Sequence, residues 1–467
     1  MSTVLQRLGG ALEREAPSWD IRPVPIGERR LSGLDQAVLW CSLSLGFLVL
    51  VTGTLLVPAL GLRDALLAIV VGSVVGCLPL ALVAVAGARE GVPGMVLFRP
   101  VLGLRGSYVP SVLNVVQLVG WTAVEYWAMG RVAEAVSERV FGFGAYPLWL
   151  VLAAVVCTLL ALGGPVIVVR RWLERFGVYL VLGAAIWMTW GVLTSADVGA
   201  LWRRPGAGGL PFWLAVDLVI AMPISWLPLV ADYSRLARPG AGTFRGTYLG
   251  YLAGNVWFYA LGGLLVLGAG ASADVTGMGV AVAGLTAGVA VLVALLVVET
   301  DEAFADVYSA AVSSQNVVPR ASQRTLILGV SGVAFVLAWF LSMDAYELFL
   351  FLIGSVFVPL FGVFAAHYFV VQRGRYDPAS LFEQGGKYWF RGGVNPRALV
   401  PWTGGFALYH WCAPIGPDWW VEVVGSVFRG IGLPFPLLDS ALGASLPSFV
   451  VAFAISLVVL RRRAAAP

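Results

Sequence analysis

Charged side chains are scarce in this sequence. Asp, Glu, Lys and Arg together make up 12% of the 467 residues, whereas hydrophobic residues make up 59% and the mean hydropathy is +0.86. Soluble globular domains typically carry about 25% charged residues. The composition therefore excludes a soluble globule and indicates a polytopic membrane protein.

Cysteine and histidine are also rare. The two histidines are too few and too far apart for a metal site, and the four cysteines lie in or beside apolar segments without metal-ligand spacing. These residues are His367, His410, Cys41, Cys77, Cys157 and Cys412. We therefore expect core thiols, no disulfide framework and no cofactor. Residues 1–30 lack the apolar core of a signal peptide, so we expect a cytoplasmic lead-in there.

Long apolar runs dominate the rest of the chain. Segments of roughly 20 apolar residues, the length that crosses a ~30 Å hydrocarbon core, occur about twelve times. In lipid only helices or closed barrels satisfy the backbone, so we expect an all-α protein. The predicted spans are 36–58, 65–87, 108–136, 146–168, 176–194, 211–231, 246–270, 279–314, 325–342, 345–371, 398–414 and 444–460.

Lysine and arginine are distributed unevenly between the predicted loops. Of the 30, 24 fall in the two tails and in alternate loops, five fall on the opposite side, and Arg131 ends the third span. The five are Arg63, Arg139, Arg203, Arg204 and Arg429. By the positive-inside rule both termini are cytoplasmic. The net charge of +4 is then an orientation signal and implies no nucleic-acid partner.

Four carboxylates interrupt the predicted span 279–314. At about 100° per residue, Glu299, Glu302 and Asp306 share one narrow face, and Asp301 points elsewhere. A charged side chain at the bilayer centre costs roughly 3 kcal/mol on insertion scales, so such residues usually face a cavity or a partner. The alternative is that these acids mark the solvated end of the helix.

A polar stripe follows the third predicted span. Asn114, Gln117, Trp121 and Glu125 are spaced so that they lie on one helix face, which must meet protein or water. Hydrogen bonding between helices is an equal explanation for Asn114 and Gln117. An indole beside a carboxylate instead favours a site for a flat heteroaromatic ring that carries an amino group.

Composition predicts a helix interruption in each of two spans, at Ser42–Gly46 and at Ala221–Pro228. Transporters bind their substrates beside helices broken by Gly or Pro, where freed backbone groups serve as ligands. The two interruptions are five spans apart, the offset of a five-plus-five inverted repeat.

Four motifs in sequence order resemble the nucleobase:cation symporter-1 family, and within it the branch of cytosine and hydroxymethylpyrimidine permeases. They are Leu39–Leu56, Pro110–Val124, Met222–Arg235 and Asp306–Ala310. The resemblance covers most of residues 35–371. It implies a leucine-transporter-like fold, with two inverted five-helix repeats, two extra helices and alternating access around a central site.

The resemblance also implies roles for individual residues. Trp121 and Trp226 would enclose the substrate ring, Glu125 would hydrogen-bond it, and Ser225 would make a polar or backbone contact beside it. From the polar stripe, Gln117 is also expected to bind the substrate. Carbonyls near Ser42 and Gly46, with side chains of the eighth span, would form a sodium site.

This sequence departs from the family at the cation site. Asp301-Glu302 stands where relatives commonly have two hydroxyl residues. Carboxylates there could bind sodium more strongly or carry a proton, because acids so close together are not all ionised at once. The coupling ion, H⁺ or Na⁺, therefore stays open. The expected coupling residues are Asp301, Glu302, Glu299, Asp306, Ser42 and Gly46, of which Ser42, Gly46, Asp301 and Glu302 could hold sodium.

The sequence predicts a multi-pass transporter of the inner (plasma) membrane and no enzyme. It would import a small heteroaromatic compound, such as hydroxymethylpyrimidine or cytosine, by cation-coupled alternating access. A cationic thiamine-like substrate, a purine and an uncoupled facilitator are the alternatives, and the oligomeric state is open, a monomer included. The expected parts are 1–34 (cytoplasmic), 35–371 (core, with repeats 35–200 and 205–371), 372–397 (cytoplasmic loop), 398–460 (two extra helices with an extracytoplasmic loop) and 461–467 (tail).

Overall fold

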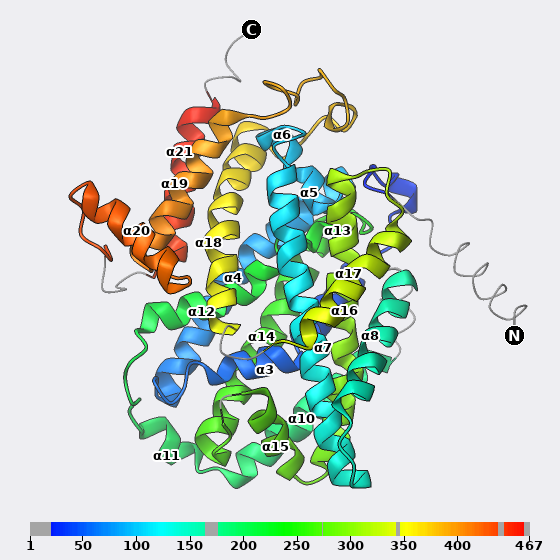
Figure 1. Cartoon of the computed structure of the whole chain (residues 1–467), viewed down its shortest axis with the longest axis vertical. Helices are drawn as coiled ribbons and strands as arrows, with labels where there is room; N and C mark the ends of the chain where they lie inside the picture. The colour runs from blue at the N-terminus through cyan, green and yellow to red at the C-terminus, as the bar shows by residue number, and fades with distance from the viewer. Residues whose placement is uncertain (1–19, 164–175, 273, 342–345, 438–442, 462–467) are drawn as a thin grey trace, which may run out of the picture.

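The computed structural model describes residues 20–163, 176–272, 274–341, 346–437 and 443–461, and within these ranges the regular elements are helices. Figure 1 shows their arrangement. The elements are η1 (Ile26–Glu28), α2 (Gly33–Ser42), α3 (Phe47–Thr54), α4 (Leu62–Glu90), α5 (Gly94–Leu97), α6 (Arg99–Leu102), α7 (Tyr108–Phe141), α8 (Tyr146–Gly163), α10 (Val178–Ser195), α11 (Val198–Arg203), α12 (Phe212–Ser225), α13 (Val230–Ser234), α14 (Ala241–Ala269), α15 (Val275–Gly284), α16 (Gly288–Val317), α17 (Gln323–Ala338), α18 (Tyr346–Ala365), η4 (Ala366–Val371), η5 (Ala379–Leu381), α19 (Pro396–Cys412), α20 (Asp418–Gly430) and α21 (Ser445–Arg461).

Six of the described helical segments are long and apolar enough to cross a membrane, and the bent pair α2 and α3 makes a seventh. The two longest helices, α7 with 34 residues and α16 with 30, are not among them. Both carry the polar residues noted above, which lower their mean hydropathy. A helix that can reach across the bilayer and yet is polar must present that polarity to the protein interior.

Most predicted spans correspond to one described helix or one broken pair. The prediction for 279–314 is wrong in one respect, because α15 ends at Gly284 and α16 begins at Gly288. Between them Ala287 adopts a left-handed backbone with φ of 55°. Glycine on each side of this turn lowers helix propensity, which explains why a continuous apolar run does not form one helix. Residues 164–168 of the fourth predicted span lie outside the described ranges.

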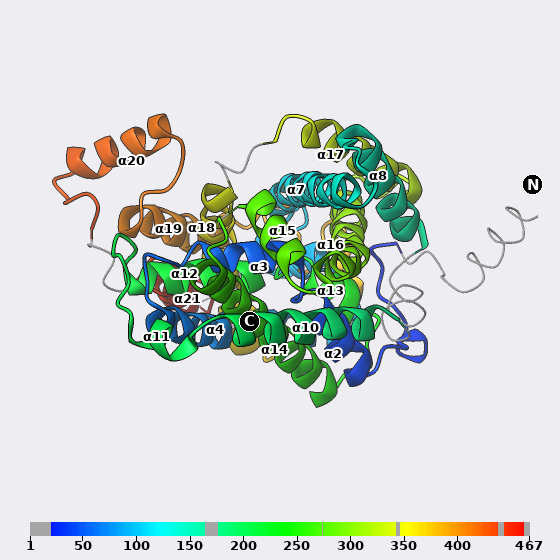
Figure 2. The same cartoon turned by 90° about the horizontal axis from the view of Figure 1, so that it is seen from below.

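Two helix breaks lie at the predicted interruptions. The axes of α2 and α3 differ by 55°, and Gly46 is the residue that precedes α3. The other break follows Ser225, where α12 ends and α13 resumes at Val230. Seen from below, α3 lies near the middle of the molecule (Figure 2). Backbone groups freed at these breaks therefore lie in the interior, where polar side chains can meet them.

Glycines of α14 allow the first broken span to pack closely. A β-carbon on Gly250 would lie 2.5 Å from the carbonyl oxygen of Ala37, and one on Gly246 or Gly254 would overlap the α2 region. The spacing of four residues places these glycines on one face, the small-residue pattern that lets membrane helices approach. α14 thus holds α2 and α3 in position.

The two additional helices expected after residue 398 are α19 and α21, and α20 lies in the connection between them. All three lie at one side of the molecule (Figure 1). Asp217 of α12 accepts hydrogen bonds from the backbone N–H groups of Ala444 (2.5 Å) and Ser445 (3.3 Å). A buried carboxylate of the core therefore caps the first turn of α21.

Candidate functional site

A small cavity lies where α7, α12 and α16 meet. Its volume is about 10 Å³, room for about one water molecule. The lining residues are Trp121, Glu125, Met222, Ser225, Trp226, Glu302 and Asp306. Five of these seven come from the two motifs, in α7 and at the α12 break, that the sequence singled out. A ring compound can enter only when the lining helices move apart.

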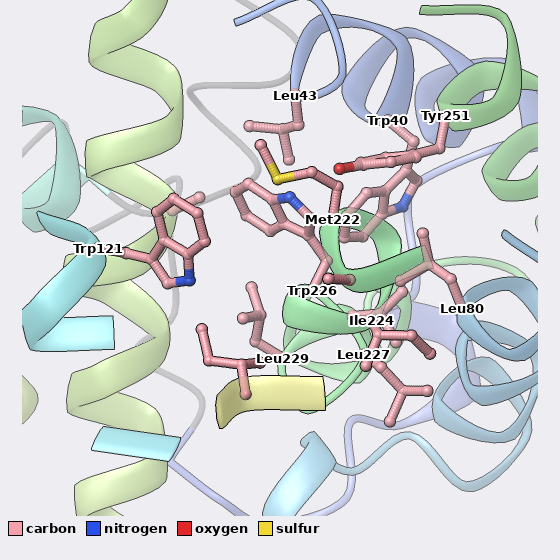
Figure 3. Packing of buried hydrophobic residues seen from close by; sticks show 14 of the residues in the cluster. Trp40, Leu43, Leu80, Trp121, Met222, Ile224, Trp226, Leu227, Leu229 and Tyr251 are labelled. Carbon is pink, nitrogen blue, oxygen red and sulfur yellow. The ribbon is translucent and has the colours of Figure 1, made fainter. Parts of the chain in front are cut away.

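Two tryptophans face each other across this cavity. Figure 3 shows the rings of Trp121 and Trp226 pointing toward one another, with Met222 beside Trp226. Both side chains are buried, at 5% and 6% exposure. Phe349 packs edge-on to Trp121, with ring centroids 5.3 Å apart, and Trp40 packs edge-on to Trp226 at 5.9 Å. These contacts fix both indole planes, so the structure brings together the two aromatic residues expected to hold the substrate.

Three carboxyl groups share the same cavity. Glu125 comes from α7, whereas Glu302 and Asp306 come from α16. Glu125 is 1% exposed, and its charge would be repelled by those of Asp306, Glu302 and Glu299. Within the described residues neither Glu125 nor Glu302 forms an ion pair, and one oxygen of each has no hydrogen-bond partner. Such acids need a ligand cation, a proton or a metal ion to balance them.

The remaining acids of α16 contact the break between α2 and α3. Glu299 accepts a hydrogen bond of 2.6 Å from the backbone N–H of Phe47, the first residue of α3. Asp301 accepts one of 3.3 Å from the hydroxyl of Ser42. All four acids of α16 are at most 5% exposed, in the middle of a 30-residue helix. The alternative that they mark a solvated helix end is therefore wrong.

Gly46 meets the same helix. The carboxyl group of Glu302 lies so close to Gly46 that a β-carbon there would overlap it. Ser42 thus contacts Asp301, and Gly46 contacts Glu302. The four residues expected to form a cation site therefore meet where the break between α2 and α3 contacts α16. These oxygen ligands suit a hard cation such as sodium, and the carboxyl groups suit a proton equally well.

Gln117 serves a structural purpose in this arrangement. Its amide nitrogen donates to the side-chain oxygen of Asn114 (2.7 Å) and to the backbone carbonyl of Ser225 (3.1 Å). The Ser225 hydroxyl donates to the carbonyl of Met222 at 2.7 Å. Hydrogen bonds within and between α7 and α12 therefore account for the donors of both residues, and their direct contact with a substrate stays a prediction.

Met222 lines the cavity but was not among the expected substrate-binding residues, and Asp306 was expected only among the coupling residues. Met222 stands next to Pro223 in the interruption of the sixth predicted span, so its position in the motif was a usable signal. Phe349 gave no such signal, because it comes from α18 and an apolar helix offers many equivalent phenylalanines.

Most of the chain matches a family of known proteins. A family model described as "Permease for cytosine/purines, uracil, thiamine, allantoin" matches residues 23–434. The chain belongs to this family. This is the nucleobase:cation symporter-1 family, which the four sequence motifs resemble. The permease is accordingly a multi-pass membrane transporter and no enzyme.

Relatives of the permease are similar over most of their length. The hydantoin permease of Microbacterium maritypicum is 23% identical over 405 residues, 83% of this chain and 82% of the relative. The allantoin permease of Bacillus subtilis is 24% identical over 425 residues, 81% and 84% of the two chains.

Solved structures establish the fold. Mhp1, a nucleobase-cation-symport-1 family transporter, in a closed conformation with bromovinylhydantoin bound, has a TM-score of 0.80 at 20% identity and covers 96% of this chain and 95% of its own. A Na⁺-coupled sialic acid symporter has a TM-score of 0.61 at 14% identity, with 94% and 90% covered. The expected leucine-transporter-like fold is confirmed.

Proposed function

We propose that the permease imports a small heteroaromatic compound by cation-coupled alternating access. The observation that carries this proposal is the cavity in which Trp121 and Trp226 face each other beside three buried carboxyl groups. A pair of fixed indoles offers stacking surface to both faces of a flat ring, and the carboxyl groups offer acceptors to its edge.

The names of the relatives support a small ring compound as the substrate. They are named for hydantoin and allantoin, and the family for cytosine, purines, uracil, thiamine and allantoin. A pyrimidine such as hydroxymethylpyrimidine or cytosine is within this range of size and shape. The cavity holds about 10 Å³, so binding requires the broken helices to open it and transport requires them to close again.

We propose the proton as the coupling ion. Glu302 lies against Gly46 at the break of the first span and also lines the cavity. Its charge therefore acts on the residues of the break and on the residues of the cavity. The charges that act on Glu302 come from Glu299, Asp306 and Asp301, all acidic. Acids so close cannot all be ionised, so at least one holds a proton. The affinity of that acid for its proton changes as the helices move.

The distribution of arginine supports a location in the cytoplasmic membrane with both termini inside. Figure 1 places α6 and α11 at opposite ends of the molecule. The loops assigned to the cytoplasm include the one beside α6, and the arginines Arg203 and Arg204 assigned to the other side lie at the end of α11.

Uptake in proteoliposomes tests the proposal. Radiolabelled pyrimidines, purines, hydantoin and thiamine would be offered to the purified permease, and binding would be followed in detergent. Stacking of a base on an aromatic contributes on the order of 1–3 kcal/mol, so Trp121→Ala and Trp226→Ala should each weaken binding at least about tenfold. Trp190→Ala is the matched control, because Trp190 is 66% exposed on α10.

Two outcomes would reject the proposal. One is wild-type affinity in a well-folded Trp121→Ala protein, which would make this tryptophan a packing residue. The other is uptake that only equilibrates the ring compound and never accumulates it against its gradient, which would identify an uncoupled facilitator of the same fold.

A further inference from the structure

We infer that the substrate is a heteroaromatic cation rich in N–H donors, such as an aminopyridinium or aminopyrimidinium ring, and that Glu125 holds its positive edge. This inference rests on the proposed function and narrows its substrate class. It excludes, as preferred substrates, neutral rings whose edges consist of carbonyl groups.

Carboxyl and amide oxygen atoms are prominent among the hydrogen-bonding groups around the cavity. Oε2 of Glu125 and Oε1 of Glu302 have no partner within the described residues, and neither has Oε1 of Gln117. The amide and hydroxyl donors beside these oxygen atoms are already used, because the Gln117 amide donates twice and the Ser225 hydroxyl donates to Met222. A ligand that satisfies the oxygen atoms of this lining brings donors.

The charge around the cavity is also one-sided. Three of its seven lining residues are acidic, and none is lysine, arginine or histidine. Isolated carboxylates removed from water are costly unless an opposite charge accompanies them. A ligand cation lowers that cost, whereas a neutral carbonyl compound would place its oxygen atoms beside acidic oxygen atoms.

The aromatic lining favours the same ligand. A cation over the face of tryptophan is attracted by the ring quadrupole, most strongly when it is desolvated. Trp121 and Trp226 are both buried and flank the cavity, so a positively charged ring between them would gain this attraction on each face.

Glu125 is the acid best placed to recognise the substrate itself. It comes from α7 and lines the cavity, whereas Glu302 lies against Gly46 and Glu299 caps α3. A division of labour follows, in which Glu125 recognises the substrate and the acids of α16 couple its movement to the cation.

A pair of isosteric probes tests the inference. 4-Amino-1-methylpyridinium and 1-methyl-4-pyridone have the same shape, but the first is a permanent cation with an amino donor and the second is neutral with a carbonyl acceptor. Binding to the purified full-length permease would be measured by calorimetry, and uptake in proteoliposomes. We expect the cation to bind at least about tenfold more tightly, the effect of one charge-assisted hydrogen bond.

Variants of Glu125 locate the effect. Gln is isosteric with a protonated Glu and carries a donor, so Glu125→Gln should lose at least about tenfold in affinity for the cation and leave affinity for the neutral probe equal or higher. Glu138→Gln is the control, because Glu138 is an exposed acid on the same helix. Thermal stability of each variant would be recorded alongside.

The outcomes separate this inference from the proposed function. Tighter binding of the neutral pyridone by the wild-type protein, or an unchanged cation affinity in folded Glu125→Gln, would overturn the inference while ring transport stands. Failure of every ring compound, charged or neutral, to bind or enter would instead overturn the proposed function.

Discussion

A β-carbon at Gly46 would overlap the carboxyl group of Glu302, which makes this glycine a direct test of the coupling residues. Overpacking of a buried contact costs about 1–3 kcal/mol. In Gly46→Ala we therefore expect Glu302 to be displaced and substrate uptake in proteoliposomes to fall about tenfold. Gly332→Ala is the control, because a β-carbon at Gly332 on α17 meets nothing within 4 Å.

A second substitution separates displacement from simple misfolding. Glu302→Asp shortens the side chain by one methylene group and makes room for the new β-carbon. Uptake should therefore be higher in the double variant than in Gly46→Ala alone. Unchanged uptake in Gly46→Ala would show that the contact with Glu302 has no part in transport.

Individual site residues were predictable where their chemistry conflicts with lipid. Glu125, Glu302 and Asp306 are costly in a bilayer, so their presence alone indicated an interior cavity, and the structure places all three on one. Gln117 was ambiguous for a physical reason. An amide serves equally as a ligand for substrate and as a bond between helices, and only the position of the Ser225 carbonyl shows where its donors go.

At the scale of elements, Asp217 connects the core to the additional helices. Its carboxylate caps the first turn of α21 through Ala444 and Ser445. Loss of such a cap costs about 0.5–2 kcal/mol, so Asp217→Ala should lower the melting temperature of the purified permease. Asp217→Asn keeps one acceptor oxygen, so its melting temperature should lie between those of the wild-type protein and of Asp217→Ala.

Exposed caps provide the comparison. Asp197 accepts from the backbone N–H of Ala200 at the solvent-exposed start of α11, where water can replace the lost bond. We expect Asp197→Ala to change the melting temperature less than Asp217→Ala. Equal effects of the two substitutions would show that the cap of α21 contributes no more than an exposed one.

Helix positions were predictable from apolar length, but helix continuity was not. The breaks at Ser42–Gly46 and after Ser225 were indicated by Gly and Pro, whereas the break between α15 and α16 was missed. Both sides of that break are apolar, so hydropathy remains high across it. The backbone of Leu285 is extended and that of Ala287 is left-handed, and the flanking glycines lower helix propensity without specifying this backbone.

At the scale of the whole molecule, cysteine labelling tests the orientation. In a background with the four native cysteines replaced by alanine, Arg203→Cys and Arg320→Cys each introduce one thiol at an exposed position. An impermeant maleimide should label Arg203→Cys in intact cells and Arg320→Cys only after permeabilisation, because the positive-inside rule places them on opposite sides. The reverse pattern would show the opposite orientation. Labelling of both variants in intact cells would contradict the predicted placement of the two positions on opposite sides.

Coupling is likewise a property of the whole molecule, because an ion drives transport only by binding the two conformations with different affinity. Glu302 lines the cavity and lies against Gly46, so its environment changes when α3 moves relative to α16. If it carries the coupling proton, uptake should rise with an imposed inward proton gradient, proceed without sodium and lose its dependence on external pH in Glu302→Gln.

The control for this experiment is Glu138→Gln, whose uptake should keep the pH dependence of the wild-type protein because Glu138 is exposed and remote from the cavity lining. Sodium and proton gradients would be imposed separately on the same proteoliposomes, with the membrane potential clamped by potassium and valinomycin. Strict dependence on sodium with no response to the proton gradient would reverse the assignment. Ser42, Gly46, Asp301 and Glu302 would then be sodium ligands.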